Sequence, residues 1–285
     1  MIVTLDRLLD IANAENKAIG SFNVTGLEQI RACLEAAEEE NEPIILAFAQ
    51  VHEEEGTIDL DTLGPIMVLM ADLSPLPICV HLDHCVDMGY LKKALDMGFS
   101  SVMFDGSALP LEENVAYTKM AVELAHSYGA TIEGEIGVMS GHTLNNDGVV
   151  EDREQDENMY TDPVVARDFV RETGIDCLAC SFGTVHGLYA TEPKLNFELL
   201  AKLNETLGVP VVMHGGSGVS EEDFHKCIDN GVRKINYYTY MAKAGAEAAT
   251  SYKNDGKVLF QDVAYAAQLA MKADAKQAIK IFKNK

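Results

Sequence analysis

Three histidines of this chain follow short apolar runs, where imidazoles can meet at one end of a β-sheet. His84 follows the run at 76–80 in "HLDHC", His186 follows "CLACSFGTV" and His214 follows "VPVVM". A lone histidine of this kind is more often a hydrogen-bonded structural residue, but three in equivalent positions favour a shared role. Three neutral imidazoles can bind zinc and leave a fourth position for water or substrate. The sequence therefore predicts an open, catalytic zinc site with one ion per chain.

Carboxylates accompany these histidines. Asp83 directly precedes His84, and a carboxylate beside a metal can exchange a proton with a substrate hydroxyl. Asp105 in "MFDGS" and Glu135 in "EGEIG" end two further apolar runs. We expect them to form a second metal position or to support the ligands, with salt bridging as the alternative. His81 is expected to support Asp83 or the barrel rim without binding the metal. The remaining histidines are interpreted as structural residues: His52, His126, His142 and His225.

A glycine-rich segment follows the third of these histidines. "HGGSGVS", residues 214–220, runs into the helical pattern "EEDFHKCIDNG". Backbone N–H groups in such a turn, together with a helix N-terminus, can bind an anion. The next apolar run ends in "KINYYTY", which presents Asn236 and Thr239. We therefore predict a phosphate site here, whereas no GxxxxGK[ST] motif supports an ATPase.

The elements that must position these residues alternate between strand-like and helix-like patterns. Apolar residues recur at helical spacing in segments such as "LEQIRACLEAAEEE" and "PVVARDFVRETG". Between them lie eight short β-rich runs, at residues 19–24, 43–48, 77–81, 101–104, 131–136, 176–181, 209–213 and 232–236. Alternation without an evident linker predicts a parallel sheet with helical crossovers.

Eight such units in 285 residues fit a (β/α)8 TIM barrel, which typically takes about 250 residues. A doubly wound open sheet is the alternative, but its GxGxxG turn is absent after the first strand. We expect one barrel domain over residues 1–285, with a C-terminal helical segment. Residues 137–163 lack periodicity and follow the fifth strand. They are therefore expected to form a long active-site loop on the C-terminal face of the barrel.

Charge and cysteine content limit the classes of function. The chain has 22 basic and 45 acidic side chains, a formal net charge of −23, which repels nucleic acid and anionic membranes. "MIVTLDRLLD" shows no secretory signal and no apolar window is long enough to span a bilayer, so a cytoplasmic location is expected. The six cysteines fit reduced core residues. Cys177 and Cys180 form a CxxC inside a predicted strand, where core packing is the preferred interpretation over zinc binding.

The motifs occur in a recognisable order. "SFNV", "VHLDH", "SVMFDGS", "EGEIG", "YTDP", "SFGTVHG", "HGGSG" and "KIN" follow one another as in class II, metal-dependent ketose-bisphosphate aldolases. The chain resembles this family over nearly its whole length. The resemblance implies a TIM barrel that reversibly cleaves a phosphorylated ketose, such as fructose or tagatose bisphosphate. The products would be dihydroxyacetone phosphate and an aldehyde, formed through a metal-stabilised enediolate. A homodimer or homotetramer is also implied.

The resemblance assigns roles to individual residues. His84, His186 and His214 would bind Zn²⁺, and Asp83 would donate and accept the proton at the C4 hydroxyl of the substrate. A monovalent cation, Na⁺ or K⁺, would lie near Val185 and Gly187. The dihydroxyacetone phosphate half would be held by Asn23, Gly187, Gly215, Gly216, Ser217, Asn236 and Thr239.

Some segments depart from the family pattern. Members usually carry a Glu in the loop after "EGEIG", but "VMSGHTLNNDG" places Thr143 or Asn146 there, so His142 or a loop carboxylate would replace it. "NYYTY" has Tyr238 and Tyr240 where the family has a small or acidic residue and an acid. "AFAQVHEEE" differs from the usual Ser/Gly-containing loop. The dihydroxyacetone phosphate end is therefore kept and the aldehyde end altered, which leaves fructose bisphosphate or a less usual sugar phosphate as the substrate.

Two other classes of function remain open on the sequence. A zinc-dependent hydrolase can use the same barrel, because three histidines and an aspartate also activate water. Such barrels often place an HxH pair on the first strand, and "GSFNV" has none. The missing loop Glu instead suggests a catalytically weakened relative that binds sugar phosphates.

Overall fold

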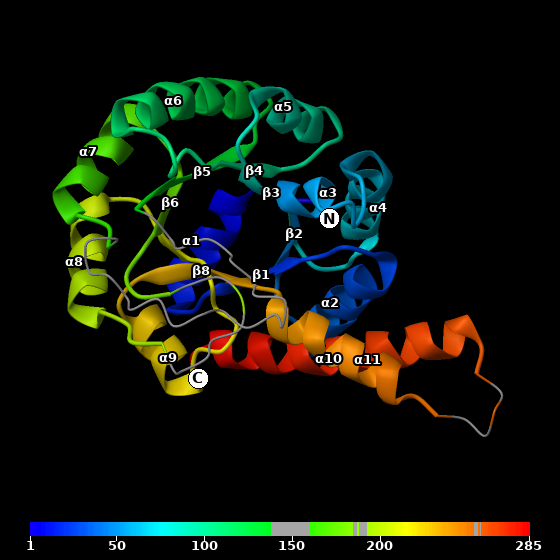
Figure 1. Ribbon diagram of the computed structural model, residues 1–285. Helices are drawn as coiled ribbons and strands as arrows, with labels where there is room; N and C mark the ends of the chain where they lie inside the picture. Colours follow the sequence, from blue (N-terminus) through cyan, green and yellow to red (C-terminus); the bar gives the residue numbers. More distant parts are fainter. Residues whose placement is uncertain (138–159, 185–186, 188–192, 254–255, 257) are drawn as a thin grey trace.

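Eight parallel strands form a closed barrel (Figure 1). The computed structural model describes residues 1–285 except 138–159, 185–186, 188–192, 254–255 and 257. The strands are β1 (Ile19–Asn23), β2 (Ile44–Ala49), β3 (Ile78–Cys85), β4 (Ser101–Phe104), β5 (Thr131–Ile136), β6 (Cys177–Cys180), β7 (Val211–Met213) and β8 (Val232–Tyr237). They pair in sequence order, and β8 closes the barrel on β1. The (β/α)8 TIM barrel predicted from the sequence is confirmed.

The third strand is longer than its apolar run predicts. β3 continues to Cys85 instead of ending at His81, so "LDHC" belongs to the strand. Its pairing with β4 is irregular, because the register shifts between Leu82 and Cys85. The β4 and β5 strands, in contrast, have the predicted bounds.

Helices surround the barrel and connect its strands (Figure 1). They are α1 (Leu5–Glu15), α2 (Leu27–Glu40), α3 (Gln50–Glu54), α4 (Leu60–Leu73), α5 (Met88–Asp96), α6 (Leu111–Ser127), α7 (Pro163–Thr173), α8 (Phe197–Leu207), α9 (Glu221–Asp229), α10 (Thr239–Ser251) and α11 (Phe260–Phe282). Asp162 caps α7 by accepting hydrogen bonds from the N–H groups of Val164 and Val165, and Gly174 ends it in a left-handed conformation. Within the described ranges, no helix has the length and apolar character needed to cross a membrane.

Apolar packing closes one end of the barrel. Leu5, Leu8 and Leu9 of α1 cluster with Ile19 and Ile45 inside the barrel, and α1 lies across its centre in Figure 1. This cluster seals the end where the strands begin. The C-terminal ends of the strands are therefore at the open end, where TIM barrels keep their active sites.

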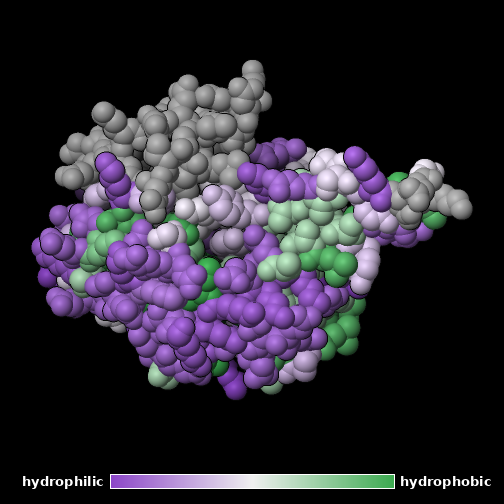
Figure 2. Space-filling view, turned by 90° about the horizontal axis from the view of Figure 1, so that it is seen from below, coloured by the Kyte–Doolittle hydropathy of each residue, from purple (hydrophilic) through white to green (hydrophobic). Residues whose placement is uncertain are grey.

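The last two helices lie side by side and project beyond the barrel (Figure 1). Ion pairs connect α11 to α2. Lys272 and Lys276 each lie 2.6 Å from a carboxylate oxygen of Glu39, and hydrogen bonds from these two lysines lower the pKa of Glu39 to about 2. Figure 2 shows an apolar area on the side of the molecule from which α10 and α11 project. Phe260 and Tyr265 are among the exposed apolar residues of α11.

The cysteines lie in the core. All six are free and buried, as the sequence predicts. Cys177 and Cys180 belong to β6, and burial raises the pKa of both thiols. They are therefore uncharged core side chains, which agrees with packing as their role.

Candidate active site

Most of the residues singled out from the sequence lie around one cavity of about 280 Å³ at the open end of the barrel. His214, directly after β7, is fully buried and contacts His84. The other members are part of the cavity lining: Asn23, Asp83, His84, Asp105, Glu135, Gly187, Gly215, Gly216, Ser217, Asn236 and Thr239. The barrel thus brings together side chains from distant parts of the sequence.

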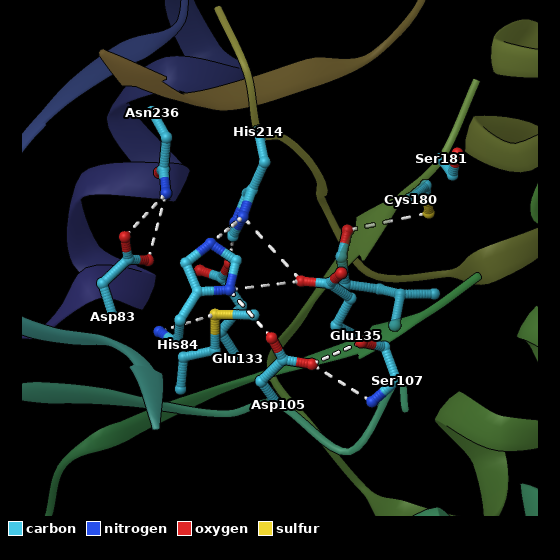
Figure 3. Close-up of polar contacts among 12 residues, drawn as sticks. Asp83, His84, Asp105, Ser107, Glu133, Glu135, Cys180, Ser181, His214 and Asn236 are labelled. Carbon is cyan, nitrogen blue, oxygen red and sulfur yellow. Dashed lines mark hydrogen bonds and ion pairs between the residues drawn. The ribbon is translucent and has the colours of Figure 1, made fainter. Parts of the chain in front are cut away.

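Asp83 and His84 are neighbours in the chain and both line the cavity (Figure 3). In a regular strand, successive side chains point to opposite faces. Here the register shifts between Leu82 and Cys85, and His84 has a φ of 48°. This left-handed backbone is uncommon for a residue other than glycine and costs about 1–3 kcal/mol. The irregularity lets one strand end supply two functional side chains.

His84 and His214 direct two ring nitrogens at each other (Figure 3). Nδ1 of His214 lies 2.9 Å from Nε2 of His84. A carboxylate holds the other nitrogen of each ring: Asp105 Oδ2 is 2.9 Å from Nδ1 of His84, and Glu133 Oε1 is 2.8 Å from Nε2 of His214. Metal-binding histidines commonly have such partners. Two nitrogens on one tetrahedral zinc are about 3.3 Å apart, so this pair is close to the spacing that zinc requires.

A third donor is buried beside the two imidazoles. Glu135 Oε2 accepts no hydrogen bond from the residues that the structure describes, and it lies 3.8 Å from Nδ1 of both His84 and His214. A buried carboxylate oxygen without a partner is costly unless a proton or a cation compensates it. Both oxygens of Asp105, in contrast, have partners. Oδ2 pairs with Nδ1 of His84, and Oδ1 accepts hydrogen bonds from the backbone N–H and the hydroxyl of Ser107. Two groups of donors therefore lie close enough to share an ion, Asp83 with His84 and His214, and Glu135 with His84 and Asp105. Imidazoles and carboxylates of this kind suit a divalent metal such as zinc.

Burial and neighbouring charges set the protonation of these groups without a metal. Burial and the charge of Asp105 raise the pKa of Glu135 well above its ordinary value. Burial alone would lower the pKa of His84, but Asp83 and Asp105 raise it to about 10. For His214, burial and the charge of His84 lower the pKa. Protons on His84 and Glu135 therefore balance the carboxylates near neutral pH.

Two amides hold the carboxylate of Asp83. Asn23 Nδ2 donates to Oδ2 at 2.9 Å, and Asn236 Nδ2 donates to both oxygens, at 3.0 and 3.1 Å. Burial alone would raise the pKa of Asp83, but the charges of His84 and Lys234 hold it well below the usual range. Asp83 is therefore an ionised carboxylate in a fixed position on the cavity wall.

The glycine-rich segment after β7 brings bare backbone to the cavity. Gly215 has a φ of 68°, which favours glycine. A Cβ added to Gly216 would lie 2.8 Å from the carbonyl oxygen of Asn236. Larger side chains in this segment would therefore displace the backbone that faces the cavity.

The helix that begins at the cavity is α10, whereas the sequence suggested α9. Thr239, the first residue of α10, lines the cavity, and the first turn of α10 has no acidic residue. The α9 helix is instead capped by Ser220 and carries three acidic residues in its first turn: Glu221, Glu222 and Asp223. The N-terminus of α10 is therefore better suited to an anion than that of α9.

Some predicted residues lie outside the described ranges. They include the third predicted zinc ligand, His186, and Val185 beside the predicted cation. Residues 138–159, which contain His142, Thr143 and Asn146, lie outside as well.

The site also contains residues that the motifs do not single out. His52, assigned a structural role from the sequence, is 8% exposed and lines the cavity with its ring centroid 5.1 Å from that of Tyr238. The departure at "AFAQVHEEE" is its sequence signal. Glu133 and Lys234 lie inside the barrel, two residues before Glu135 and Asn236. That spacing places them on the same side of their strands as cavity residues.

Known proteins resemble this chain along its whole length. The sequence matches the family described as "Fructose-bisphosphate aldolase class-II" over residues 3–285. A fructose-bisphosphate aldolase from Staphylococcus aureus is 37% identical over 284 residues, covering 99% of this chain and 97% of that protein. One from Staphylococcus epidermidis is 36% identical with the same coverage. The crystal structure of the YdjI aldolase from Escherichia coli K12 superposes with a TM-score of 0.87 at 32% identity, covering 99% of this chain and 97% of that one.

Proposed function

Because the chain belongs to the class II fructose-bisphosphate aldolase family, we propose that it reversibly cleaves a phosphorylated ketose with the help of zinc. The products are dihydroxyacetone phosphate and an aldehyde. One observation carries the proposal: a single cavity is lined by an ionised carboxylate held by amides and by His84, whose imidazole faces that of His214. The imidazoles suit a metal, and the carboxylate suits proton transfer.

The proposed zinc ligands are His84, His186 and His214, with one ion per chain. Asp105 orients His84, which its hydrogen bond to Nδ1 supports, and Glu135 is an additional donor or part of a second metal position. When bound, zinc polarises the substrate carbonyl and stabilises the negative charge that develops as the carbon–carbon bond breaks.

Asp83 is the proposed proton carrier at the C4 hydroxyl. In the cleavage direction it accepts the hydroxyl proton while C4 becomes the aldehyde carbon, and in condensation it returns that proton. Its ionised state and its hydrogen bonds from Asn23 and Asn236 support this role, because a base must be unprotonated and in place.

The proposed site for the dihydroxyacetone phosphate half consists of residues that share the cavity lining: Asn23, Gly187, Gly215, Gly216, Ser217, Asn236 and Thr239. Local N–H groups and the start of α10 can bind a phosphate there although the chain is strongly acidic overall. A monovalent cation near Val185 and Gly187 belongs to the same proposal.

Variants of the phosphate site should weaken substrate binding without loss of zinc. Hydrogen bonds to charged groups contribute about 1.5–3 kcal/mol, so Ser217→Ala and Thr239→Val should each raise KM about 10- to 100-fold. Gly215→Val should raise it as well by moving the backbone. Steady-state kinetics and zinc analysis of the same samples check this. Ser220→Ala is the matched control, because Ser220 caps α9 and is not among the described lining residues. Unchanged KM in all three site variants would place the phosphate elsewhere.

Zinc uptake should release protons even in mildly alkaline solution. His84, with a pKa of about 10, and Glu135, with a raised pKa, carry protons in the metal-free protein, and zinc ligands bind deprotonated. Apparent zinc affinity should therefore rise with pH through the neutral range and beyond. Calorimetry in buffers of different ionisation enthalpy counts the protons. An ordinary histidine, with a pKa of about 6.5, would release almost none at about pH 8, so no release there contradicts this prediction.

The direct test of the function is release of dihydroxyacetone phosphate from a panel of ketose phosphates after zinc has been restored, followed with a coupled reductase. The described lining residues include no Lys or Arg, so the panel should pair each bisphosphate with the matching ketose 1-phosphate. Release from any member supports the aldolase. Hydrolysis without carbon–carbon cleavage supports the zinc hydrolase, and binding without turnover supports the weakened relative.

We also propose that the protein is a homodimer or homotetramer. Exposed apolar residues on α11 support this, with Phe260 82% and Tyr265 55% exposed. Apolar patches of this kind on projecting helices commonly mark contacts between subunits. Light scattering on the purified protein measures its mass, and a mass equal to one chain would contradict the proposal.

A further inference from the structure

Three polar or charged side chains lie one level below the cavity, inside the barrel. His81, Glu133 and Lys234 are all 0% exposed. They precede Asp83, Glu135 and Asn236, respectively, by two positions. Because side chains two apart on a strand point the same way, the three form a layer directly beneath the cavity residues.

One ammonium group in this layer connects the two halves of the site. Lys234 Nζ lies 2.8 Å from Glu133 Oε2, and the other oxygen of Glu133 lies 2.8 Å from Nε2 of His214. The same Nζ is 4.0 Å from Oδ1 of Asp83. Lys234 therefore contacts the proposed metal ligand His214 indirectly, through Glu133, and its charge lies next to the proposed proton carrier Asp83.

The contacts also determine which ring nitrogens carry hydrogen. Lys234 Nζ lies 3.4 Å from Nε2 of His81, and Nδ1 of His81 lies 2.8 Å from the hydroxyl of Ser101. Because an ammonium only donates, Nε2 of His81 accepts and its Nδ1 carries the hydrogen. Glu133 likewise receives the hydrogen on Nε2 of His214, which leaves the lone pair on Nδ1 directed at His84.

Packing alone does not require charges at this level. Further down, the barrel interior is filled by small and apolar side chains such as Ile19, Ile45 and Cys79. A buried ion network is often no more stable than apolar side chains of similar volume. What this network achieves is the fixed placement of His214 and Asp83.

We infer that Lys234 is a positioning residue for both parts of the reaction centre. Through Glu133 it fixes the orientation in which His214 meets the metal, and through its charge it fixes Asp83. This inference rests on the proposed roles of His214 and Asp83. A residue that served folding alone would change neither metal affinity nor the balance between partial reactions.

Zinc affinity gives the first test. Glu133→Gln and Lys234→Met should each bind zinc about 10- to 100-fold more weakly than wild type, the usual effect of losing a partner of a metal ligand. Lys17→Met is the matched control, because Lys17 is also a buried lysine, 3% exposed and 2.6 Å from Glu42, but does not line the cavity. It should lower the melting temperature and leave zinc affinity unchanged.

Partial reactions at saturating zinc give the second test. Lys234→Met should still cleave ketose phosphate slowly, because Asp83 has lost its neighbouring charge. Exchange of the C1 proton of dihydroxyacetone phosphate with solvent, which does not use the C4 proton, should recover. Glu133→Gln should recover in both reactions, because its defect lies in holding His214 for the metal.

Circular dichroism verifies that each variant folds. If Lys234→Met does not fold, the double variant Glu133→Gln/Lys234→Met, which removes both charges, is measured in its place. The zinc affinity of Glu133→Gln alone can be measured in either case. Wild-type zinc affinity in Glu133→Gln overturns the inference, and so does an equal loss of affinity in Lys17→Met. A wild-type protein that binds zinc but cleaves no ketose phosphate overturns the proposed function, while the zinc measurements still decide on Lys234.

Discussion

Replacing His214 with Ala should leave the purified protein without stoichiometric zinc and without measurable cleavage of its best ketose phosphate. His214 is fully buried, and its Nδ1 faces Nε2 of His84 at 2.9 Å. Because the change removes a ligand itself, zinc affinity should fall by more than the about 10- to 100-fold typical for losing a ligand's partner. We expect the same of His84→Ala and His186→Ala. Metal analysis after dialysis and kcat on the same samples check the prediction.

His126→Ala is the matched control for these variants. His126 is a half-exposed imidazole on α6 that pairs with Asp176 at 3.0 Å and does not line the cavity. It should keep about one zinc per chain and wild-type cleavage. If His186→Ala binds zinc as tightly as wild type, the three-histidine site is wrong.

Asp83→Asn should lower kcat by about 100- to 10,000-fold, the range for loss of a general acid–base group. The amide keeps the shape of the side chain but cannot accept the proton of the C4 hydroxyl. Asp83 lies close enough to His84 and His214 to bind the same ion, so the zinc content of this variant separates two roles. A proton carrier leaves zinc content unchanged, whereas a ligand takes the zinc with it.

The contacts of Asp83 also predict the stability of this variant. Asn23 and Asn236 both donate to the carboxylate, and an amide at position 83 would direct its own N–H₂ toward one donor. A small decrease in melting temperature is therefore expected. Exchange of the C1 proton of dihydroxyacetone phosphate should survive better than cleavage, because it does not need the C4 proton. Asp10→Asn, an exposed change on α1, should behave as wild type. Wild-type cleavage by Asp83→Asn would leave that residue only a structural role.

The sequence predicts the barrel and the strand-end cluster for one physical reason. Parallel strands joined by helices have all their C-terminal ends on one side, so His84 and His214 must come near each other whatever their distance in the chain. The extension of β3 to Cys85 is not predictable in this way, because "HLDHC" lacks the alternation of a half-buried strand. Nor is the Glu133–Lys234 pair, since these residues are 101 positions apart, and a buried charge becomes favourable only when its partner is known.

The irregularity in β3 sets a condition for building this chemistry into a designed protein. On a regular strand, an adjacent aspartate and histidine would point to opposite sides, so one would enter the barrel and the other would meet the surrounding helices. The unit to transplant is the backbone from Leu82 to Cys85 with its left-handed residue at position 84, more than the two side chains it carries. Varying only the side chains on an idealised barrel would give this strand either a metal ligand or a proton carrier. To have both, the backbone itself must be redesigned.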